Sequence, residues 1–402
     1  MTTLYNNNAF CPLLFQHLAT HPVGSVSYCC ISDHADSASH SRDYSPKKIY
    51  NLSKDKIINI VNSENFRQAR VSILSGNTPG PCTVCEKNEL NGVESKRQHE
   101  RKMFPSFTED VARSITDSEG YIKEEDLNFE FIELRLGNVC NVACRTCNPY
   151  SSSKWAADYA KLTKLDNSFP IFTSHASYRW PEIEAFWIDL EKYIKNVKVI
   201  YINGGEPTLI KQHIAFLNKI SSIAGNNIEL RYNINATNLD EEIIKVWNKF
   251  RKVNIQCSID DLGIRNEYIR WPTKWDTVLG TIARLKAEKF NLAVTQTISF
   301  MNYSNVVEFY KFFSEQGVEV IHNLVYQPTY MSPAVLPKEI RDIAHAEIIQ
   351  HLPPHMSHTL INSFNNETND AEWKKAIDFT KSLDTIRNQS IVDYLPEFKG
   401  LI

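Results

Sequence analysis

Residues 140–147 read Cys140-Asn-Val-Ala-Cys144-Arg-Thr-Cys147, three cysteines in a CxxxCxxC spacing that directly follows the apolar segment Phe129–Leu136. Three thiolates at this spacing can hold three irons of a [4Fe-4S] cubane, which normally takes four cysteine ligands. The fourth iron then keeps an open coordination position, as catalytic metal sites do and closed structural sites do not. Zinc patterns are usually built from CxxC pairs. Taken alone, the run leaves a zinc site open as an alternative.

A second motif lies downstream, in the segment Val197–Pro207. It reads V-K-V-I-Y-I-N-G-G-E-P, a β-branched run that ends in Gly204-Gly205-Glu206-Pro207. Two glycines after a buried strand let the backbone approach a ligand closely, because neither has a Cβ. Glu206 adds an anion beside exposed carbonyls, which suits an ammonium group. The two glycines alone would predict only a tight turn. Together with the cysteine run, they indicate a ligand site.

The two motifs, in this order, resemble those of the radical S-adenosylmethionine (radical SAM) superfamily. The resemblance implies that S-adenosylmethionine (SAM) binds the open iron of the Cys140, Cys144 and Cys147 cluster through its amino and carboxylate groups. It also implies that Glu206 and the carbonyls of Gly204 and Gly205 bind the SAM amino group. An electron that enters the cluster would cleave SAM to methionine and a 5′-deoxyadenosyl radical, which removes hydrogen from a substrate carbon.

The central part of the chain alternates strand-like and helix-like segments. The predicted strands are Phe129–Leu136, Val197–Asn203, Ile228–Asn235, Val253–Ile259, Leu292–Ser299 and Val318–Tyr326. The predicted helices between them are Ser151–Leu162, Lys211–Ala224, Asp240–Phe250, Trp275–Lys289 and Tyr303–Gln316. Apolar strands that alternate with helices indicate an α/β fold with a parallel sheet. The six repeats match the partial (β/α)6 TIM-like barrel of the radical SAM fold, in which ligands bind at the carboxyl ends of the strands.

The sequence predicts three regions. A cysteine-rich region covers residues 1–125, the barrel covers residues 126–330, and a helical C-terminal extension covers residues 331–402. The extension is expected to contain helices at Pro337–His351 and Ala371–Ile386. The segment Leu165–Trp187 is long and aromatic, and is interpreted either as a packed insertion or as a lid over the barrel mouth.

Polar residues at three further strand ends are expected to contact SAM. In the radical SAM pattern, a hydroxyl and a carboxylate in a Ser-x-Asp sequence contact the ribose and methionyl groups, which here implies Ser258 and Asp260. Asn235, or Thr237 beside it, would serve the ribose similarly, and Gln296 lies at the next strand. Many family members place an aromatic residue just before the last cluster cysteine, against the adenine. Thr146 occupies that position here, so the adenine must be stacked elsewhere or bound more weakly. Cys257, inside a predicted strand, is interpreted as a small buried hydrophobe.

The first 125 residues hold a second set of cysteines: Cys11, Cys29, Cys30, Cys82 and Cys85. A hairpin at Val23-Gly24-Ser25 would bring Cys11 and Cys29 together. The pattern resembles the SPASM/twitch auxiliary-cluster regions of radical SAM enzymes, although those commonly follow the barrel. The resemblance implies a second [4Fe-4S] cluster, ligated by Cys11, Cys29, Cys82 and Cys85. Cys30 could replace Cys29, and a structural zinc site is the alternative.

The composition limits which partners and which cellular location are expected for this protein. The net charge of −3 gives no reason to expect a nucleic-acid partner. No secretory signal and no run of about 20 apolar residues is present, so a membrane partner is not expected. Nine cysteines in a chain without a signal peptide indicate metal ligation and not a disulfide framework. The protein is therefore expected to be cytoplasmic.

The predicted function is that of a radical SAM enzyme, an oxidoreductase whose auxiliary cluster binds the substrate or accepts an electron. A peptide or protein side chain is the favoured substrate, because the aromatic insertion could cover an extended ligand. An external donor such as a flavodoxin or ferredoxin would supply the electron. The alternative function within the same class is the oxidation or methylation of a small molecule (a sugar, alcohol or nucleotide). A non-catalytic structural metal-binding module is the alternative of another class, but it leaves Gly-Gly-Glu-Pro and Ser-x-Asp without a purpose.

Overall fold

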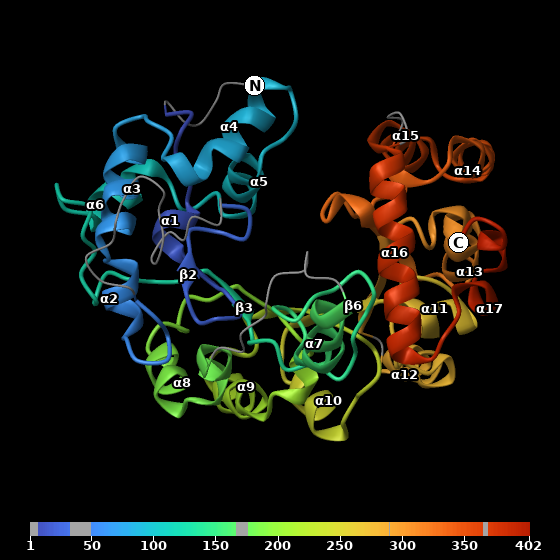
Figure 1. The fold of residues 1–402 in the computed structure, drawn as a ribbon. Helices are drawn as coiled ribbons and strands as arrows, with labels where there is room; N and C mark the ends of the chain where they lie inside the picture. The colour runs from blue at the N-terminus through green and yellow to red at the C-terminus, as the bar shows by residue number, and fades with distance from the viewer. Residues whose placement is uncertain (1–6, 33–49, 166–175, 289, 365–368) are drawn as a thin grey trace. The chain divides into compact units, whose positions relative to one another are not determined.

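The computed structural model describes residues 7–32, 50–165, 176–288, 290–364 and 369–402 (Figure 1). The chain divides into two compact units. The first consists of Met1–Val139, His175–Tyr232 and Asp240–Val253. The second consists of Cys140–Ser174, Asn233–Leu239 and Asn254–Ile402. Each unit contains parallel strands and the helices that follow them.

The first unit contains β1 to β4 and most of β5, in the spatial order β2-β1-β3-β4-β5. These strands are β1 (His17–Thr20), β2 (Val26–Ser27), β3 (Phe131–Arg135), β4 (Val199–Asn203) and β5 (Glu229–Ile234). All neighbouring pairs are parallel except β1 and β2, which form an antiparallel hairpin. Its helices are α1 (Leu13–Gln16), α2 (Ile57–Val61), α3 (Glu64–Leu74), α4 (Thr83–Leu90), α5 (Lys96–Met103), α6 (Glu109–Ile115), α8 (Glu184–Glu191), α9 (Lys211–Ala224) and α10 (Glu241–Trp247).

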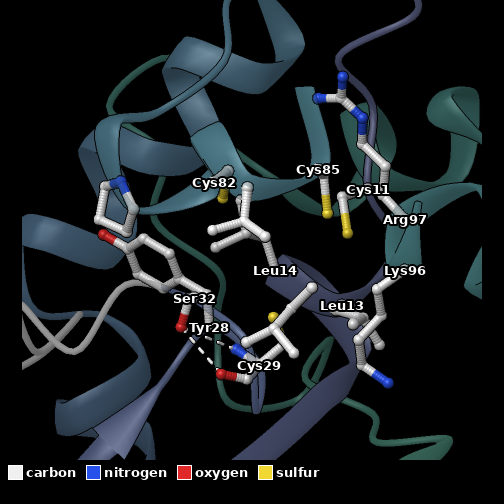
Figure 2. Close-up of a pocket in the computed structure, with 13 residues that line it drawn as sticks. Cys11, Leu13, Leu14, Tyr28, Cys29, Ser32, Cys82, Cys85, Lys96 and Arg97 are labelled. Atoms are coloured by element: carbon white, nitrogen blue, oxygen red, sulfur yellow. Dashed lines mark hydrogen bonds between the residues drawn. The ribbon is translucent and has the colours of Figure 1, made fainter. Parts of the chain in front are cut away.

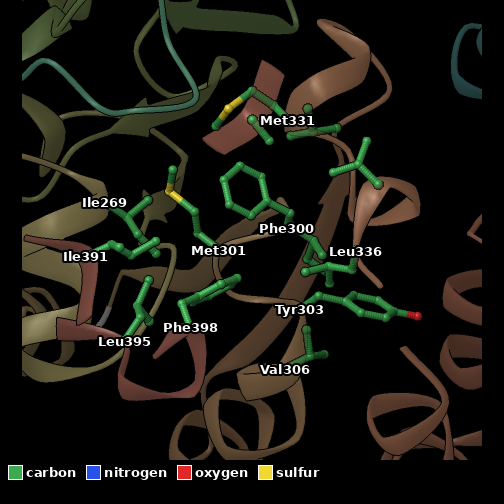
Figure 3. Close-up of a cluster of buried hydrophobic side chains, with 14 of the residues drawn as sticks. Ile269, Phe300, Met301, Tyr303, Val306, Met331, Leu336, Ile391, Leu395 and Phe398 are labelled. Atoms are coloured by element: carbon green, nitrogen blue, oxygen red, sulfur yellow. The ribbon is translucent and has the colours of Figure 1, made fainter. Parts of the chain in front are cut away.

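The second unit contains most of β6 (Lys252–Ser258), followed by β7 (Asn291–Ile298) and β8 (Glu319–Leu324), in parallel. Its helices are α7 (Ala156–Leu165), α11 (Gly263–Ile269), α12 (Trp275–Ala287), α13 (Val306–Ser314), α14 (Lys338–His351), α15 (Pro354–Ser363), α16 (Asp370–Arg387) and α17 (Ile391–Tyr394). A large apolar core joins the end of β7 to the C-terminal helices. Figure 3 shows Phe300, Met301 and Phe398 in this core, with Ile391 and Leu395 from the last turns of the chain.

All six predicted strands form, as β3 to β8, and helices separate them along the chain. The α/β fold class is therefore confirmed, and so is the helical C-terminal extension. The predicted hairpin is also present, with Gly24 at a φ of +80° in its turn. The sequence did not predict that β1 would run parallel to β3, with His17 opposite Phe131. This strand has only four residues, too few for a recognisable alternating pattern.

The described part of the aromatic insertion is packed inside the first unit. Trp180, Phe186 and Trp187 are buried, and their rings meet edge to face. Trp187 also packs against Phe216 of α9. These residues therefore form core and not a lid. Residues 166–175 of the insertion lie outside the described residues.

Candidate metal centres and ligand site

The loop after β3 brings the three predicted cluster thiols together in the second unit. Cys144 is buried, whereas Cys140 and Cys147 are partly exposed. Burial raises the pKa of Cys147 to about 11 and that of Cys144 further still. Repulsion by neighbouring thiols is a smaller cause of both shifts. Without a bound cation Cys144 and Cys147 therefore stay protonated, whereas a metal would bind them as thiolates.

Hydrogen bonds from the protein hold this loop in place. The backbone N–H groups of Ala143 and Arg145 donate to the carbonyls of Trp271 and Ile269, each over 2.7 Å. The Trp155 indole N–H donates to the Cys144 carbonyl over 2.9 Å. The loop is therefore fixed on both sides of its central cysteine.

Two buried arginines connect the same loop to the C-terminal helix α16. Arg387 of α16 donates to the Ala143 carbonyl over 2.8 Å and to Asp158 over 2.9 Å. Arg145 of the loop donates to Asp384 of α16 over 2.6 Å. Both arginine side chains are fully buried. The sequence analysis did not identify either arginine, because their partners lie more than 200 residues away along the chain.

The Gly-Gly-Glu-Pro motif packs against the end of β3 within the first unit. Gly204 and Gly205 have φ values of +88° and +53°. A Cβ on Gly204 would lie 2.7 Å from the Leu136 backbone nitrogen, and one on Gly205 would lie 2.3 Å from the Val139 carbonyl oxygen. Glu206 donates its backbone N–H to that same carbonyl over 2.8 Å. Val139 directly precedes Cys140, so the motif fixes the residue from which the cysteine loop starts.

Glu206 also has a structural role that the sequence analysis missed. Its side chain is completely buried, and its Oε1 accepts hydrogen bonds from the Thr208 backbone N–H over 3.1 Å and the Thr208 hydroxyl over 2.7 Å. The carboxylate therefore caps the short helical turn Pro207–Leu209. An acidic residue followed by Pro and Thr is a capping pattern, which is the signal that could have indicated this role.

Asn235 lies beside the cluster loop in the second unit. Its Nδ2 donates to Asn141 Oδ1 over 2.7 Å and lies 3.9 Å from Cys140 Sγ. Its Oδ1 accepts from the backbone N–H and the hydroxyl of Thr237. Thr237 in turn accepts from Asn141 over 2.9 Å. These three side chains form one closed hydrogen-bonded group next to a cluster cysteine.

The other predicted SAM contacts do not share one face. Ser258 lies opposite Thr295 in the β6–β7 register, so the next residue, Gln296, points to the other side of the sheet. Gln296 is fully buried and donates to the Asp260 carbonyl over 3.0 Å. The strand ends at Ser258, so Asp260 does not continue its alternation. Its Oε1 is buried and has no hydrogen-bond partner among the described residues, so the contact of Gln296 with SAM stays a prediction.

Asp260 is likewise fully buried and bound to protein groups. Its carboxylate accepts from Arg270 over 3.1 Å and from the Thr297 backbone N–H over 3.0 Å. Both Asp260 and Arg270 act electrostatically on Cys144: the guanidinium lowers the pKa of the thiol and the carboxylate raises it. In this structure, Asp260 positions a buried cation next to the cluster loop.

A cavity of about 650 Å3 opens against the cluster loop in the second unit. This volume is within the range of small-molecule sites. Its wall includes Thr146 and Cys147, and the aromatic residues Trp155, Tyr159, Tyr330 and Phe379. Aromatic rings from other elements thus surround the position where the loop itself has Thr146.

The second set of cysteines surrounds one cavity in the first unit. Figure 2 shows Cys11 and Cys85 next to each other, with Cys82 and Cys29 at other sides of the same space. Burial, with a smaller contribution from repulsion by neighbouring thiols, raises the pKa of Cys11 and Cys29 to about 12. Lys96 and Arg97 at the start of α5 supply positive charge at the edge of the cavity. The hairpin and the turn before α4 bring the four thiols together.

Cys30 is oriented differently from this set. It does not line the cavity, and its nearest electrostatic partners include Glu133 of β3, Lys96 and Arg135. Among the two adjacent cysteines, the structure therefore favours Cys29 as the ligand in the cavity.

Both thiol groups fit iron–sulfur clusters by the chemistry of their donors. The four thiols of the first unit border a space and do not meet at a point. In the described residues, no group of three or more His, Cys, Asp or Glu side chains is spaced to hold a single metal ion. No helix of the described part of the chain has the length and apolar character needed to cross a membrane.

Two family models match the sequence. Residues 134–315 match the model described as the radical SAM superfamily. Residues 11–87 match the model named SPASM, described as an iron–sulfur cluster-binding domain. The SPASM match lies N-terminal to the radical SAM match, in the predicted order. The cofactors of these two families are the predicted ones: [4Fe-4S] clusters and SAM. A comparison with curated proteins gives no match.

Solved structures give matches of low sequence identity. Native anSMEcpe with bound AdoMet is 16% identical over 59% of this chain and 63% of that chain, with a TM-score of 0.39. The complex of native anSMEcpe with AdoMet and the Cp18Cys peptide is 14% identical over 55% of this chain and 58% of that chain, with a TM-score of 0.36. Streptococcus suis SuiB bound to the precursor peptide SuiA is 12% identical over 83% of this chain and 68% of that chain, with a TM-score of 0.34. The chain thus spans less than two thirds of the anSMEcpe chains.

Proposed function

We propose that this chain, which carries a radical SAM domain at residues 134–315 preceded by a SPASM domain at residues 11–87, is an enzyme that removes hydrogen from a substrate carbon. The [4Fe-4S] cluster, when bound, supplies the electron that cleaves SAM to methionine and the 5′-deoxyadenosyl radical. The observation that carries the proposal is the convergence of three thiols in a hydrogen-bonded loop whose preceding residue, Val139, is held by the Gly-Gly-Glu-Pro motif.

The residues of the loop would bind and shield the cluster. Cys140, Cys144 and Cys147 are the proposed ligands, and the buried guanidinium of Arg270 offsets the negative charge at Cys144. Asn235 presents its amide N–H near Cys140 Sγ. Because the loop backbone is bonded on both sides, its cysteines keep their positions and water is excluded from Cys144.

The SAM amino group would bind where the backbone of Gly204 and Gly205 is exposed without a Cβ, beside Glu206. The adenine would be stacked by a ring from another part of the chain, since stacking needs a planar ring and Thr146 has none. Ser258 remains the proposed hydroxyl contact to the ribose or methionyl groups. Asp260 acts through Arg270.

The four thiols Cys11, Cys29, Cys82 and Cys85 are the proposed ligands of the auxiliary cluster. We infer that this cluster binds the substrate or accepts an electron from it, and that an external flavodoxin or ferredoxin reduces the SAM-binding cluster. The substrate is proposed to be a peptide or a protein side chain.

The test is the formation of 5′-deoxyadenosine by anaerobically reconstituted protein with dithionite and SAM, measured by liquid chromatography. We expect product from the wild type and none from Cys144→Ser. The matched control is Cys257→Ser, which changes a buried cysteine of β6 that belongs to neither thiol group. The proposal fails if the wild type forms no 5′-deoxyadenosine, or if Cys144→Ser forms as much as the wild type. A methyl gain on the product would instead identify a methyltransferase.

A further inference from the structure

One face of the first unit's sheet carries a row of polar side chains. In the strand register, Glu133 of β3 lies opposite Tyr201 of β4, and Tyr201 lies opposite Arg231 of β5. Directly opposite residues share a face, and so do residues two apart on one strand. Arg135 and its partner Asn203 therefore lie on this face as well. A polar row across three neighbouring parallel strands is unusual, because such strands are normally apolar.

Glu133 is the residue of this row whose hydrogen bonding is incomplete. Its side chain is almost fully buried, with 1% of the residue exposed. Oε1 accepts from Nε and Nη2 of Arg135, each over 3.3 Å. Oε2 is buried and accepts no hydrogen bond from an N–H or O–H group, although the Cys30 thiol lies within reach of this carboxylate. A thiol is a weak donor, so a ligand that supplies an N–H or O–H group would stabilise the buried oxygen better.

Within the first unit, the row lies between the auxiliary thiols and the Gly204-Gly205 pair when β4 is followed along the chain. At the start of β4, Val199 packs in one apolar cluster with Cys29, and Tyr201 packs against that cluster. At the end of β4, Asn203 directly precedes Gly204 and Gly205. Cys30 lies beside Glu133 and Arg135 at the same level. A substrate bound on this row would therefore reach from the auxiliary thiols toward Gly204 and Gly205, within the first unit.

We propose that this row binds the backbone of a peptide substrate, with a peptide N–H donating to Glu133 Oε2 and a peptide carbonyl accepting from Arg135 or the Tyr201 hydroxyl. The inference rests on the proposed function and names the residues that select its substrate class. Three strands at a spacing of ~4.8 Å span about 10 Å, the length of three extended peptide residues. The row also offers an acceptor and donors side by side, as a peptide unit requires.

Binding of blocked tripeptides tests the proposal. The probes are the twenty acetyl-Gly-Xaa-Gly-amides, added to the reconstituted holoprotein with S-adenosylhomocysteine and followed by saturation-transfer NMR. We expect a subset to bind the wild type, and Glu133→Gln and Arg135→Gln to raise the dissociation constant about tenfold or more, as loss of a charged hydrogen bond does. The matched control is Glu130→Gln, which removes a carboxylate that precedes β3 and pairs with Lys198. Iron content and melting temperature check that each variant folds.

Three results would overturn the inference: no tripeptide binds the wild type, the two variants bind like the wild type, or Glu130→Gln weakens binding equally. Glycerol and glucose serve as small-molecule probes, and binding of these in place of the peptides would also contradict it. The proposed function has a separate readout. If 5′-deoxyadenosine forms normally while these binding results fail, only the substrate inference is wrong.

Discussion

At the scale of single residues, the Gly204-Gly205 pair has a role that only glycine can fill. Both residues have positive φ values, and both approach the backbone of the β3 end more closely than any Cβ allows. The sequence indicated close approach to a ligand. The structure adds that the first group approached is the protein's own backbone, immediately before the cluster loop.

Replacing Gly205 by Ala is therefore expected to destabilise the folded protein strongly. The new Cβ would lie 2.3 Å from the Val139 carbonyl oxygen, which belongs to backbone and cannot rotate away. We expect a loss on the order of 3 kcal/mol in the free energy of unfolding, from steric overlap and an unfavourable φ. Urea denaturation measures it. Gly280→Ala in α12 is the control, because a Cβ there meets nothing within 4 Å. Equal effects of the two substitutions would contradict the packing seen at Gly205.

His213 of α9 is held neutral inside the first unit. The Ile210 carbonyl can only accept, so Nδ1 donates to it over 2.5 Å, and Nε2 accepts from the Tyr232 hydroxyl over 3.1 Å. Burial lowers the pKa of His213 to about 4 from its usual 6.5. Between these two pKa values the unfolded chain binds a proton at this histidine and the folded chain does not. The free energy of unfolding therefore decreases as the pH falls below 6.5.

The neutral His213 is expected to lower the free energy of unfolding by about 2 kcal/mol when the pH is changed from 7 to 5. His213→Gln can still donate and accept hydrogen bonds but does not titrate, so its stability should depend less on pH by that amount. Urea unfolding at the two pH values measures the difference. The exposed His355, changed to Gln, should leave the wild-type pH dependence as it is. A pH dependence of His213→Gln identical to that of the wild type would refute the neutral buried state.

At the scale of elements, α16 supports the loop that contains the proposed cluster ligands. Arg387 lies over the rings of Trp155 and Trp271, at 4.8 and 4.6 Å from their centroids, and is hydrogen-bonded to the loop. Arg145 of the loop donates a hydrogen bond to Asp384 of α16, and its Cζ lies 3.6 Å from the Tyr268 ring centroid. Figure 1 shows α14, α15 and α16 grouped in the C-terminal part of the chain. The extension is thus part of the cluster site's framework.

Arg387→Met is expected to reduce the free energy of unfolding by about 3 to 5 kcal/mol, because it leaves the buried Asp158 carboxylate without its cation. Chemical denaturation of the reconstituted protein provides the measurement. Arg179→Met removes an exposed arginine that pairs with Glu182, and should change stability by less than about 0.5 kcal/mol. If both variants lose the same free energy of unfolding, the buried contacts of Arg387 with the loop and Asp158 do not stabilise the protein more than an exposed ion pair does.

At the scale of the whole molecule, two groups of thiols occur in two separate compact units. If each holds a [4Fe-4S] cluster, the reconstituted chain should contain about eight irons. Cys82→Ser should lower this to about four, whereas Cys30→Ser should leave it at about eight, because Cys30 does not line the cavity. Iron and zinc analysis checks both. One zinc and about four irons in the wild type would show that the N-terminal cysteines bind zinc.

The sequence by itself determined the α/β class, the six strands, both cysteine groups and the Gly-Gly-Glu-Pro motif. These features are local: apolar runs, turn residues and short ligand spacings lie within a few residues of one another. The strand β1 was not predicted because it is short, and the side of the sheet on which Gln296 lies became clear only from the register of β6 and β7.

Tertiary structure alone decided the rest. Arg145 and Arg387 meet their partners across more than 200 residues, Tyr330 reaches the cavity beside Thr146 from the loop after β8, and Glu133 faces Tyr201 only through strand pairing. Such contacts depend on where distant elements pack, which no local pattern encodes. The hydrogen bonding of the buried Glu133 carboxylate likewise depends on strand pairing and on Cys30, more than 100 residues away along the chain.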